Sequence, residues 1–262
     1  MPNYRRFDKS LTIAAALVVA CLFAATASPS ALAQNAEPPV QDLRAGGEEK
    51  MRFFLIGPMQ AETPKEGYRL LLVLPGGDGG EDFRTFVTNM LPNALPENYI
   101  IAQLVAPRWQ EGEQPIIWPT QKTRLPKMKF TTEQFIDAVI DDVKKLHTID
   151  EKHIYALGWS SGGPPVYFAA MRPATPITGA FVAMSVFKPG ELPPAKNLDG
   201  RAFYILHSPT DFIQMRFPQA ARTMLEKAGA KTHLQTYEGG HGWHGDPFGM
   251  IRAGIDWLEQ QR

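Results

Sequence analysis

The sequence lacks three features that would point to other classes of protein. It holds a single cysteine, Cys21, so no internal disulfide or cysteine-based metal site can form. Beyond the N-terminal region, no apolar run is long enough to span a bilayer. Acidic and basic side chains number 27 each, so there is no excess of charge to attract nucleic acid or an anionic membrane. Stability must come from an ordinary apolar core, which roughly 230 residues can supply.

The N-terminal segment has the layout of a secretory signal peptide. Three basic residues within the first nine precede a mostly apolar run over residues 11–25, and Ala31-Leu32-Ala33 matches an A-x-A cleavage site. We therefore predict a signal peptide over residues 1–33 and export to the periplasm or the medium. Cleavage there would remove three basic residues and one acidic residue, leaving 24 basic and 26 acidic side chains from the 27 of each, a net charge of −2.

A bacterial lipoprotein is the alternative form of export. The stretch Val18-Val19-Ala20-Cys21 resembles a lipoprotein box, and lipidation would fall on Cys21. The apolar residues that continue past Cys21, and the better cleavage site at Ala33, favour the signal peptide.

The remaining chain is predicted to be a polar linker or arm over residues 34–50 and one α/β domain over residues 51–262. Buried strands alternate with amphipathic helices, which predicts a mostly parallel sheet with helices on both faces. The Pro-rich stretch 185–200 is short, so we expect little or no cap domain. The expected strands are 51–56, possibly at a sheet edge, then 70–74, 99–106, one starting at His153, 177–184, 201–207 and 231–237. One expected helix covers residues 81–91 and ends at Pro92. Another begins at Thr131, which forms a capping box with Gln134, and its buried apolar stripe extends to Leu146.

The central motif is Gly158-Trp159-Ser160-Ser161-Gly162, a match to G-x-S-x-G between a predicted strand and a predicted helix. A strand that turns abruptly into a helix forces the middle residue into a strained conformation, and the flanking glycines avoid the collisions that side chains would cause. Ser160 is therefore the candidate nucleophile. The alternative is a strand-to-helix turn with a capping serine.

A serine hydroxyl needs a base, and the base needs a carboxylate that orients it. Asp211 follows a predicted strand at the same sheet edge as Ser160, whereas Asp199 precedes that strand and Glu238 lies too close to the histidine loop. His241 stands between glycines after the last strand, and His244 is the alternative base. A metal site at His241 and His244 lacks a third convincing ligand.

The loop Pro75-Gly76-Gly77-Asp78-Gly79-Gly80 follows a buried strand. No Lys-Ser or Lys-Thr pair follows its glycines, so a phosphate-binding P-loop is disfavoured. We expect instead an oxyanion hole made by the backbone N–H groups of Gly77 and Ser161. Three tryptophans, Trp118, Trp159 and Trp243, are candidates for contact with a substrate, although packing is the more frequent role of such residues.

Over nearly all of residues 51–262 the chain resembles the α/β-hydrolase superfamily. The resemblance rests on the Pro75-Gly76-Gly77 loop, the Ser160 motif, the Asp211 turn and the Gly240-His241-Gly242-Trp243 loop. It is similar to the compact esterase branch, near the phospholipase/carboxylesterase, dienelactone-hydrolase and feruloyl-esterase-like members. Many members carry a histidine where this chain has Pro75, a departure that concerns loop packing.

The resemblance implies a catalytic triad of Ser160, His241 and Asp211 that needs no cofactor or metal. The expected function is an exported serine hydrolase acting on a small-molecule carboxylic ester, with no nucleic-acid partner. A peptidase of the prolyl-oligopeptidase type is the first alternative, and a non-catalytic binding protein on the same fold is the second. The oligomeric state and the identity of the ester are not legible in the sequence.

Overall fold

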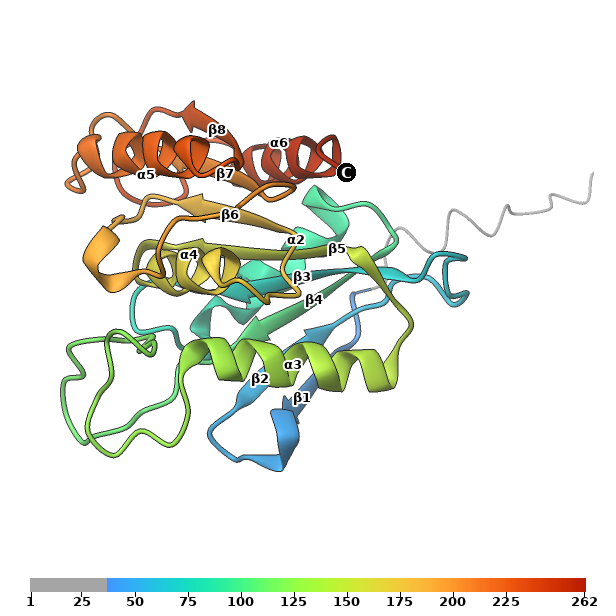
Figure 1. The fold of residues 1–262 in the computed structure, drawn as a ribbon. Helices are drawn as coiled ribbons and strands as arrows, with labels where there is room; N and C mark the ends of the chain where they lie inside the picture. Colours follow the sequence, from blue (N-terminus) through green and yellow to red (C-terminus); the bar gives the residue numbers. More distant parts are fainter. Residues whose placement is uncertain (1–36) are drawn as a thin grey trace, which may run out of the picture. The chain divides into compact units, whose positions relative to one another are not determined.

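The structure is a computed structural model that describes residues 37–262, so the predicted signal peptide lies outside the described residues. This part of the chain forms an eight-stranded sheet in the order β1-β2-β4-β3-β5-β6-β7-β8 (Figure 1). Strand β2 pairs antiparallel with β1 and β4, and the other neighbours are parallel. The strands are β1 (Val40–Arg44), β2 (Arg52–Ile56), β3 (Tyr68–Leu74), β4 (Tyr99–Leu104), β5 (Ile149–Trp159), β6 (Gly179–Ala183), β7 (Ala202–His207) and β8 (Lys231–Thr236).

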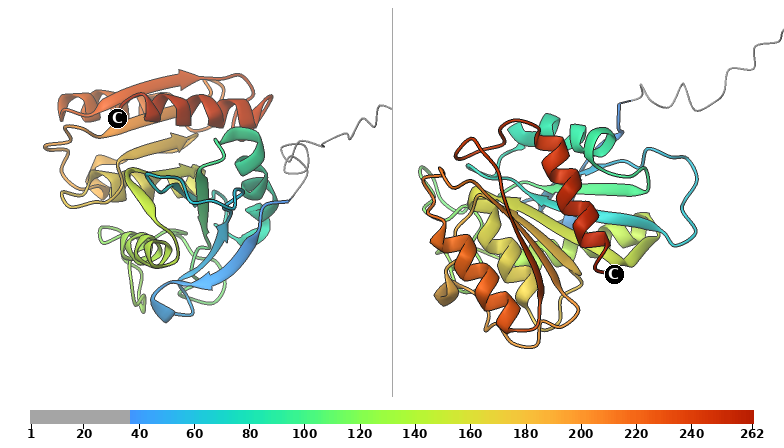
Figure 2. Two further views of the ribbon diagram at one scale, coloured as in Figure 1. Left: turned by 90° about the vertical axis from the view of Figure 1, so that its right-hand side faces the viewer. Right: turned by 90° about the horizontal axis from the view of Figure 1, so that it is seen from above.

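Helices cover both faces of the sheet (Figure 2). Helices α3, α4 and α5 pack on one face, while α2 and α6 pack on the other and contact each other. The helices are α2 (Arg84–Ala94), α3 (Thr132–Leu146), α4 (Gly163–Met171), α5 (Arg216–Lys227) and α6 (Pro247–Glu259), and the 3₁₀ turns are η1 (Ala45–Gly47), η2 (Glu81–Phe83), η3 (Ser160–Gly162) and η4 (Pro189–Glu191). No helix within residues 37–262 has the length and apolar character needed to cross a bilayer.

The burial of both sheet faces explains why the parallel strands have continuous apolar sequences. In β3, Leu70, Leu72 and Leu74 belong to the core on the α3 side, while Leu71 and Val73 belong to the core on the α2 side. A strand covered on both faces cannot alternate apolar and polar residues. The predicted α/β class and the near absence of a cap are both confirmed, because residues 185–200 hold only the short turn η4.

The expected linker over residues 34–50 is wrong for its second half. Residues 40–44 form β1, the edge strand, so β2 lies one position inside the edge, and the compact unit begins at Glu37 rather than at residue 51. The strand shows no apolar face because it is mostly exposed. Its backbone ladder with β2 and the ion pair between Asp42 and Arg52 (2.8 Å) hold it in place.

Two details of the predicted helices also differ. Helix α2 does not end at Pro92 but includes it in its last turn, because the burial of Leu91 and Ala94 offsets the one backbone hydrogen bond that the proline removes. The capping box of Thr131 and Gln134 is confirmed at the start of α3. Leu146, in the last position of that helix, is 53% exposed and lies outside the buried stripe.

Candidate active site

The Ser160 motif forms a sharp turn from β5 through η3 into α4. Ser160 itself has a positive φ of 51°, a strained conformation for a residue with a side chain. A Cβ atom at Gly158 would lie 2.3 Å from the Gly162 carbonyl oxygen, and one at Gly162 would lie 2.0 Å from the Leu74 carbonyl oxygen. Both positions therefore require glycine, and the turn presents the Ser160 hydroxyl beyond the end of the strand.

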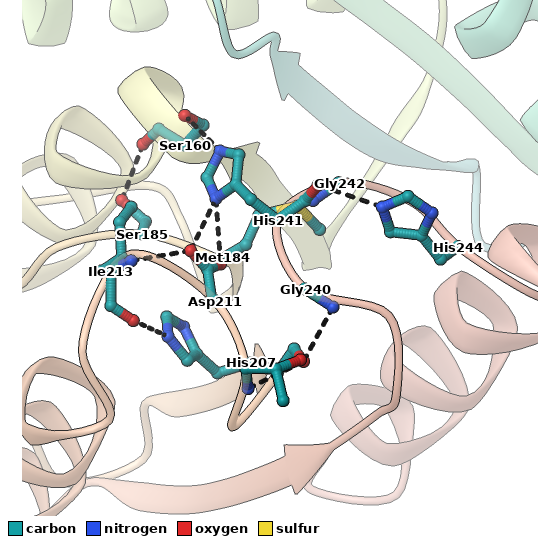
Figure 3. A network of polar contacts seen from close by, with 12 residues as sticks. Ser160, Met184, Ser185, His207, Asp211, Ile213, Gly240, His241, Gly242 and His244 are labelled. Carbon is teal, nitrogen blue, oxygen red and sulfur yellow. Dashed lines mark hydrogen bonds and ion pairs between the residues drawn. The ribbon is translucent and has the colours of Figure 1, made fainter.

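Three side chains from separate loops meet at this turn (Figure 3). The Ser160 Oγ lies 3.1 Å from His241 Nε2, and His241 Nδ1 lies 2.9 Å and 3.0 Å from the two oxygens of Asp211. Ser160 follows β5, Asp211 follows β7 and His241 follows β8, so all three stand at the carboxyl ends of parallel strands. With Nδ1–H donated to Asp211, Nε2 is left to accept the hydroxyl proton of Ser160.

The carboxylate of Asp211 is held in a fixed orientation. Its side chain is fully buried, while that of His241 is 23% exposed. The backbone N–H of Ile213 donates to Asp211 Oδ1 (2.7 Å), and the buried His207 donates through Nε2 to the Ile213 carbonyl (2.6 Å). These contacts, visible in Figure 3, leave the carboxylate no freedom to rotate away from His241.

The loop that carries His241 is fastened on several sides. The Tyr237 hydroxyl oxygen lies 2.8 Å from the carbonyl oxygens of both Gly240 and Gly242, one on either side of His241, and shares its single proton between them. Burial, and then the charge of Asp211, raises the pKa of Tyr237 to about 12. The hydroxyl is therefore a neutral donor throughout the physiological pH range.

The alternative residues weighed in the sequence do not reach the nucleophile. His244 turns away from Ser160 and contacts the carbonyl of His241 through Nε2 (3.1 Å), as Figure 3 shows. Asp199 lies beside Gly229 ahead of β7, and the carboxylate on His241 belongs to Asp211 rather than to Glu238.

The glycine loop after β3 packs directly against the serine turn. A Cβ atom at Gly76 would lie 3.0 Å from the Cβ of Ser160, so only glycine allows this approach. Ser161 donates its Oγ to the carbonyl of Gly77 (2.8 Å), which ties the loop to the turn. Within residues 37–262 the N–H of Gly77 has no acceptor of its own. The residues expected to form an oxyanion hole, Gly77 and Ser161, are thus adjacent to Ser160.

The three tryptophans proposed for substrate contact divide into two groups. Trp118 is 2% exposed and donates its Nε1 to the Pro75 carbonyl (3.0 Å), and Trp159 is 4% exposed, so both rings are packed into the apolar core next to the site. A role in direct substrate contact stays a prediction for these two residues. Trp243 is half-buried and stands edge-on to Trp159 with ring centres 5.8 Å apart.

Solved structures share this architecture. A carboxylesterase from Bacillus cereus superposes with a TM-score of 0.56 at 15% identity, covering 89% of this chain and 99% of its own. A carboxylesterase from Mesorhizobium loti gives 0.59 at 18% identity, covering 86% and 99%. The acylaminoacyl peptidase of Pyrococcus horikoshii gives 0.61 at 14% identity, covering 88% of this chain but 42% of the peptidase. The chain has the α/β-hydrolase fold. No protein-family model and no curated protein sequence matches it.

Sequence reasoning missed the residues that support the arrangement of Ser160, His241 and Asp211. Ser185, two residues after β6, donates its Oγ to the Ser160 carbonyl (2.7 Å). Met184 accepts the N–H of Gly242 at its sulfur (3.2 Å), which joins the β6 loop to the His241 loop. The only signal in the sequence was position, since each stands just past a strand whose carboxyl end faces the site.

Proposed function

We propose that the protein hydrolyses carboxylic esters through an acyl-enzyme on Ser160. The observation that carries the proposal is the continuous hydrogen-bond chain from Ser160 Oγ through His241 to the buried Asp211. An unassisted serine hydroxyl is a poor nucleophile at neutral pH, and this chain is the arrangement that activates it.

The reaction follows from the positions of these atoms. Ser160 Oγ attacks the ester carbonyl carbon while His241 Nε2 takes its proton, and the Gly77 and Ser161 N–H groups stabilise the negative oxygen that forms. The carbon–oxygen bond to the alcohol then breaks, and His241 returns the proton to the departing oxygen. Water next attacks the acyl-enzyme with His241 as base, which releases the acid and restores Ser160. Asp211 stabilises the imidazolium in both halves of the cycle.

Esters are favoured over other acyl substrates by the neighbours in structure. The Bacillus cereus and Mesorhizobium loti proteins are carboxylesterases that the chain covers almost end to end. A peptidase is the second candidate, because the acylaminoacyl peptidase has a comparable TM-score of 0.61, but this chain spans 42% of its length. Hydrolysis of 4-nitrophenyl acetate, with no hydrolysis of the anilide of an N-acetylated amino acid, would identify an esterase rather than a peptidase.

Fluorophosphonate labelling of the full chain, with the modified residue mapped by mass spectrometry, tests the proposal. We expect the label on Ser160, no label in Ser160→Ala, and at least a hundredfold slower labelling in His241→Ala, because the general base is lost. A folded wild-type protein that stays unlabelled and does not hydrolyse the ester would contradict the proposal and favour a binding protein.

We also propose that residues 1–33 direct export. Their basic start, apolar run and Ala31-Leu32-Ala33 site support this. N-terminal sequencing of protein recovered outside the cytoplasm of an expressing bacterium should begin at Gln34. A lipidated Cys21 would instead identify a lipoprotein.

A further inference from the structure

An exposed aromatic ring lies against the candidate base. Phe212 directly follows Asp211 and is 77% exposed, more than any other large apolar residue within residues 37–262. Its ring centre is 4.4 Å from that of His241, with an angle of 40° between the planes. Single exposed apolar residues are ordinary on protein surfaces, but this one touches the imidazole that would move protons during the reaction.

The backbone on both sides of Phe212 is fixed. The preceding Asp211 accepts the N–H of Ile213 (2.7 Å), and the carbonyl of Ile213 accepts from His207 (2.6 Å). The ring therefore stands at the tip of a loop that hydrogen bonds hold at both ends. A large apolar side chain kept in water gives up the stabilisation that burial would bring, which makes its position worth explaining.

The order of the strands decides which part of a substrate would meet this ring. Strand β3, which carries the Gly77 loop, lies on one side of β5, while β7 and β8, which carry Phe212 and His241, lie on the other. The ester oxyanion points toward the N–H donors of the Gly77 loop. The departing alcohol must lie against His241 Nε2 to receive its proton. A group bonded to that oxygen is within reach of Phe212.

We propose that Phe212 forms an aromatic platform for the leaving alcohol, so that the enzyme favours esters of aromatic alcohols over esters of small aliphatic ones. This inference rests on the proposed ester hydrolysis at Ser160. Offset or tilted contact between two aromatic rings adds stabilisation beyond simple burial, and in an open site this contact is available only to an aromatic alcohol.

The test compares two acetate esters in wild type and in Phe212→Ala. For both esters kcat/KM reports the steps up to acetylation of Ser160, and both give the same acetyl-enzyme. The ratio of kcat/KM for 2-naphthyl acetate to that for 2,2,2-trifluoroethyl acetate therefore measures the preference for the alcohol part of the ester. We expect this ratio to fall about fivefold in Phe212→Ala. Phe212→Tyr should retain it, because the ring is kept.

A second experiment does not depend on how readily the two alcohols act as leaving groups. An alcohol that attacks the acetyl-enzyme occupies the place of the leaving group, so the yield of benzyl acetate relative to ethyl acetate should fall by a similar factor in Phe212→Ala. Leu146→Ala is the matched control, since Leu146 is also exposed (53%) but ends α3, and it should change neither ratio. Unchanged ratios in Phe212→Ala, with Ser160 still labelled by the fluorophosphonate, would overturn the platform alone. An unlabelled wild-type Ser160 would overturn the proposed hydrolysis and the platform with it.

Discussion

Removal of the Tyr237 hydroxyl would test how far catalysis depends on the rigidity of the His241 loop. The hydroxyl donates to the carbonyls of Gly240 and Gly242 at 2.8 Å each, and so holds the backbone on both sides of His241. Tyr237→Phe keeps the ring and removes only this donor. The imidazole is then held by Asp211 at one nitrogen and by a loop with fewer contacts.

The size of the effect follows from the two carbonyls that lose the one hydroxyl proton they share. Leaving partly buried carbonyls without a hydrogen bond should lower the free energy of unfolding by about 1–2 kcal/mol. Catalysis should suffer more than stability alone implies, because a displacement of about 1 Å in a reacting group can cost up to 100-fold in rate. We expect a fall of about tenfold in kcat/KM for 4-nitrophenyl acetate.

Tyr68→Phe provides the matched control. The Tyr68 hydroxyl also donates to two backbone carbonyls, those of Gln60 and Glu62 (3.3 Å each), but it begins β3 at the opposite edge of the sheet from the Ser160 turn. This variant should lower the melting temperature while leaving kcat/KM within a factor of two. If Tyr237→Phe matched it in both measurements, the idea that the hydroxyl positions His241 would be refuted.

The same hydroxyl predicts a dependence of stability on pH. Its pKa is raised from 10.0 to about 12 in the folded protein, so the neutral form is favoured by folding. The stability that this shift contributes is complete below pH 10 and is lost as the pH rises from 10 toward 12. The difference in melting temperature between wild type and Tyr237→Phe should be constant from pH 7 to 9 and shrink above pH 10. A difference that grew over that interval would contradict the assignment.

Two further substitutions test the serine turn. Ser161→Ala removes the hydrogen bond to the Gly77 carbonyl and should lower kcat about five- to tenfold with an unchanged circular dichroism spectrum. The reason is that the Gly77 loop loses one hydrogen bond of about 1 kcal/mol that holds it in place. An unchanged kcat would show that the loop keeps its position without this bond. Gly162→Ala places a Cβ atom 2.0 Å from the Leu74 carbonyl oxygen, and urea titration should show the free energy of unfolding lowered by more than about 4 kcal/mol. Gly190→Ala is the control, because a Cβ atom there has nothing within 4 Å, and its stability should be nearly unchanged. Equal stability of these two variants would contradict the packing described for the turn.

Much of the fold was legible in the sequence because burial on both faces leaves a strong pattern. Residues 70–74 of β3 and 99–102 of β4 are continuous apolar runs, and the α/β class follows from the alternation of such strands with helices. Strand β1 was missed because backbone pairing and an ion pair hold it, and its side chains are mostly exposed. Leu146 was assigned to the buried stripe of α3 by its spacing alone, although the helix ends there and leaves it exposed.

The candidate triad could be proposed because each member lies within a few residues of the carboxyl end of a strand. Ser160, Asp211 and His241 need only the rule that parallel strands gather their carboxyl ends at one edge. The supporting contacts made by Tyr237 and His207 pass through backbone carbonyls, and they depend on the paths of loops that no periodicity encodes. The burial of Trp118 could not be read from the sequence for a related reason, since only the loop path shows that its indole hydrogen-bonds to the Pro75 carbonyl.

The strand order also determines where selectivity can arise in this protein. In the strand order, β3 with the Gly77 loop lies on one side of β5, and β7 and β8 with the loops of Asp211 and His241 lie on the other, so in the proposed reaction the acyl oxygen and the leaving alcohol would face different parts of the chain. Residues 185–200 contribute only a short turn and build no cap over the site. In the proposed ester hydrolysis, discrimination between alcohols would then come from the side chains that the β7 and β8 loops present. Phe212 is the most exposed large apolar side chain within residues 37–262, and its contact with His241 makes it the residue through which we expect a substitution to alter the proposed selectivity.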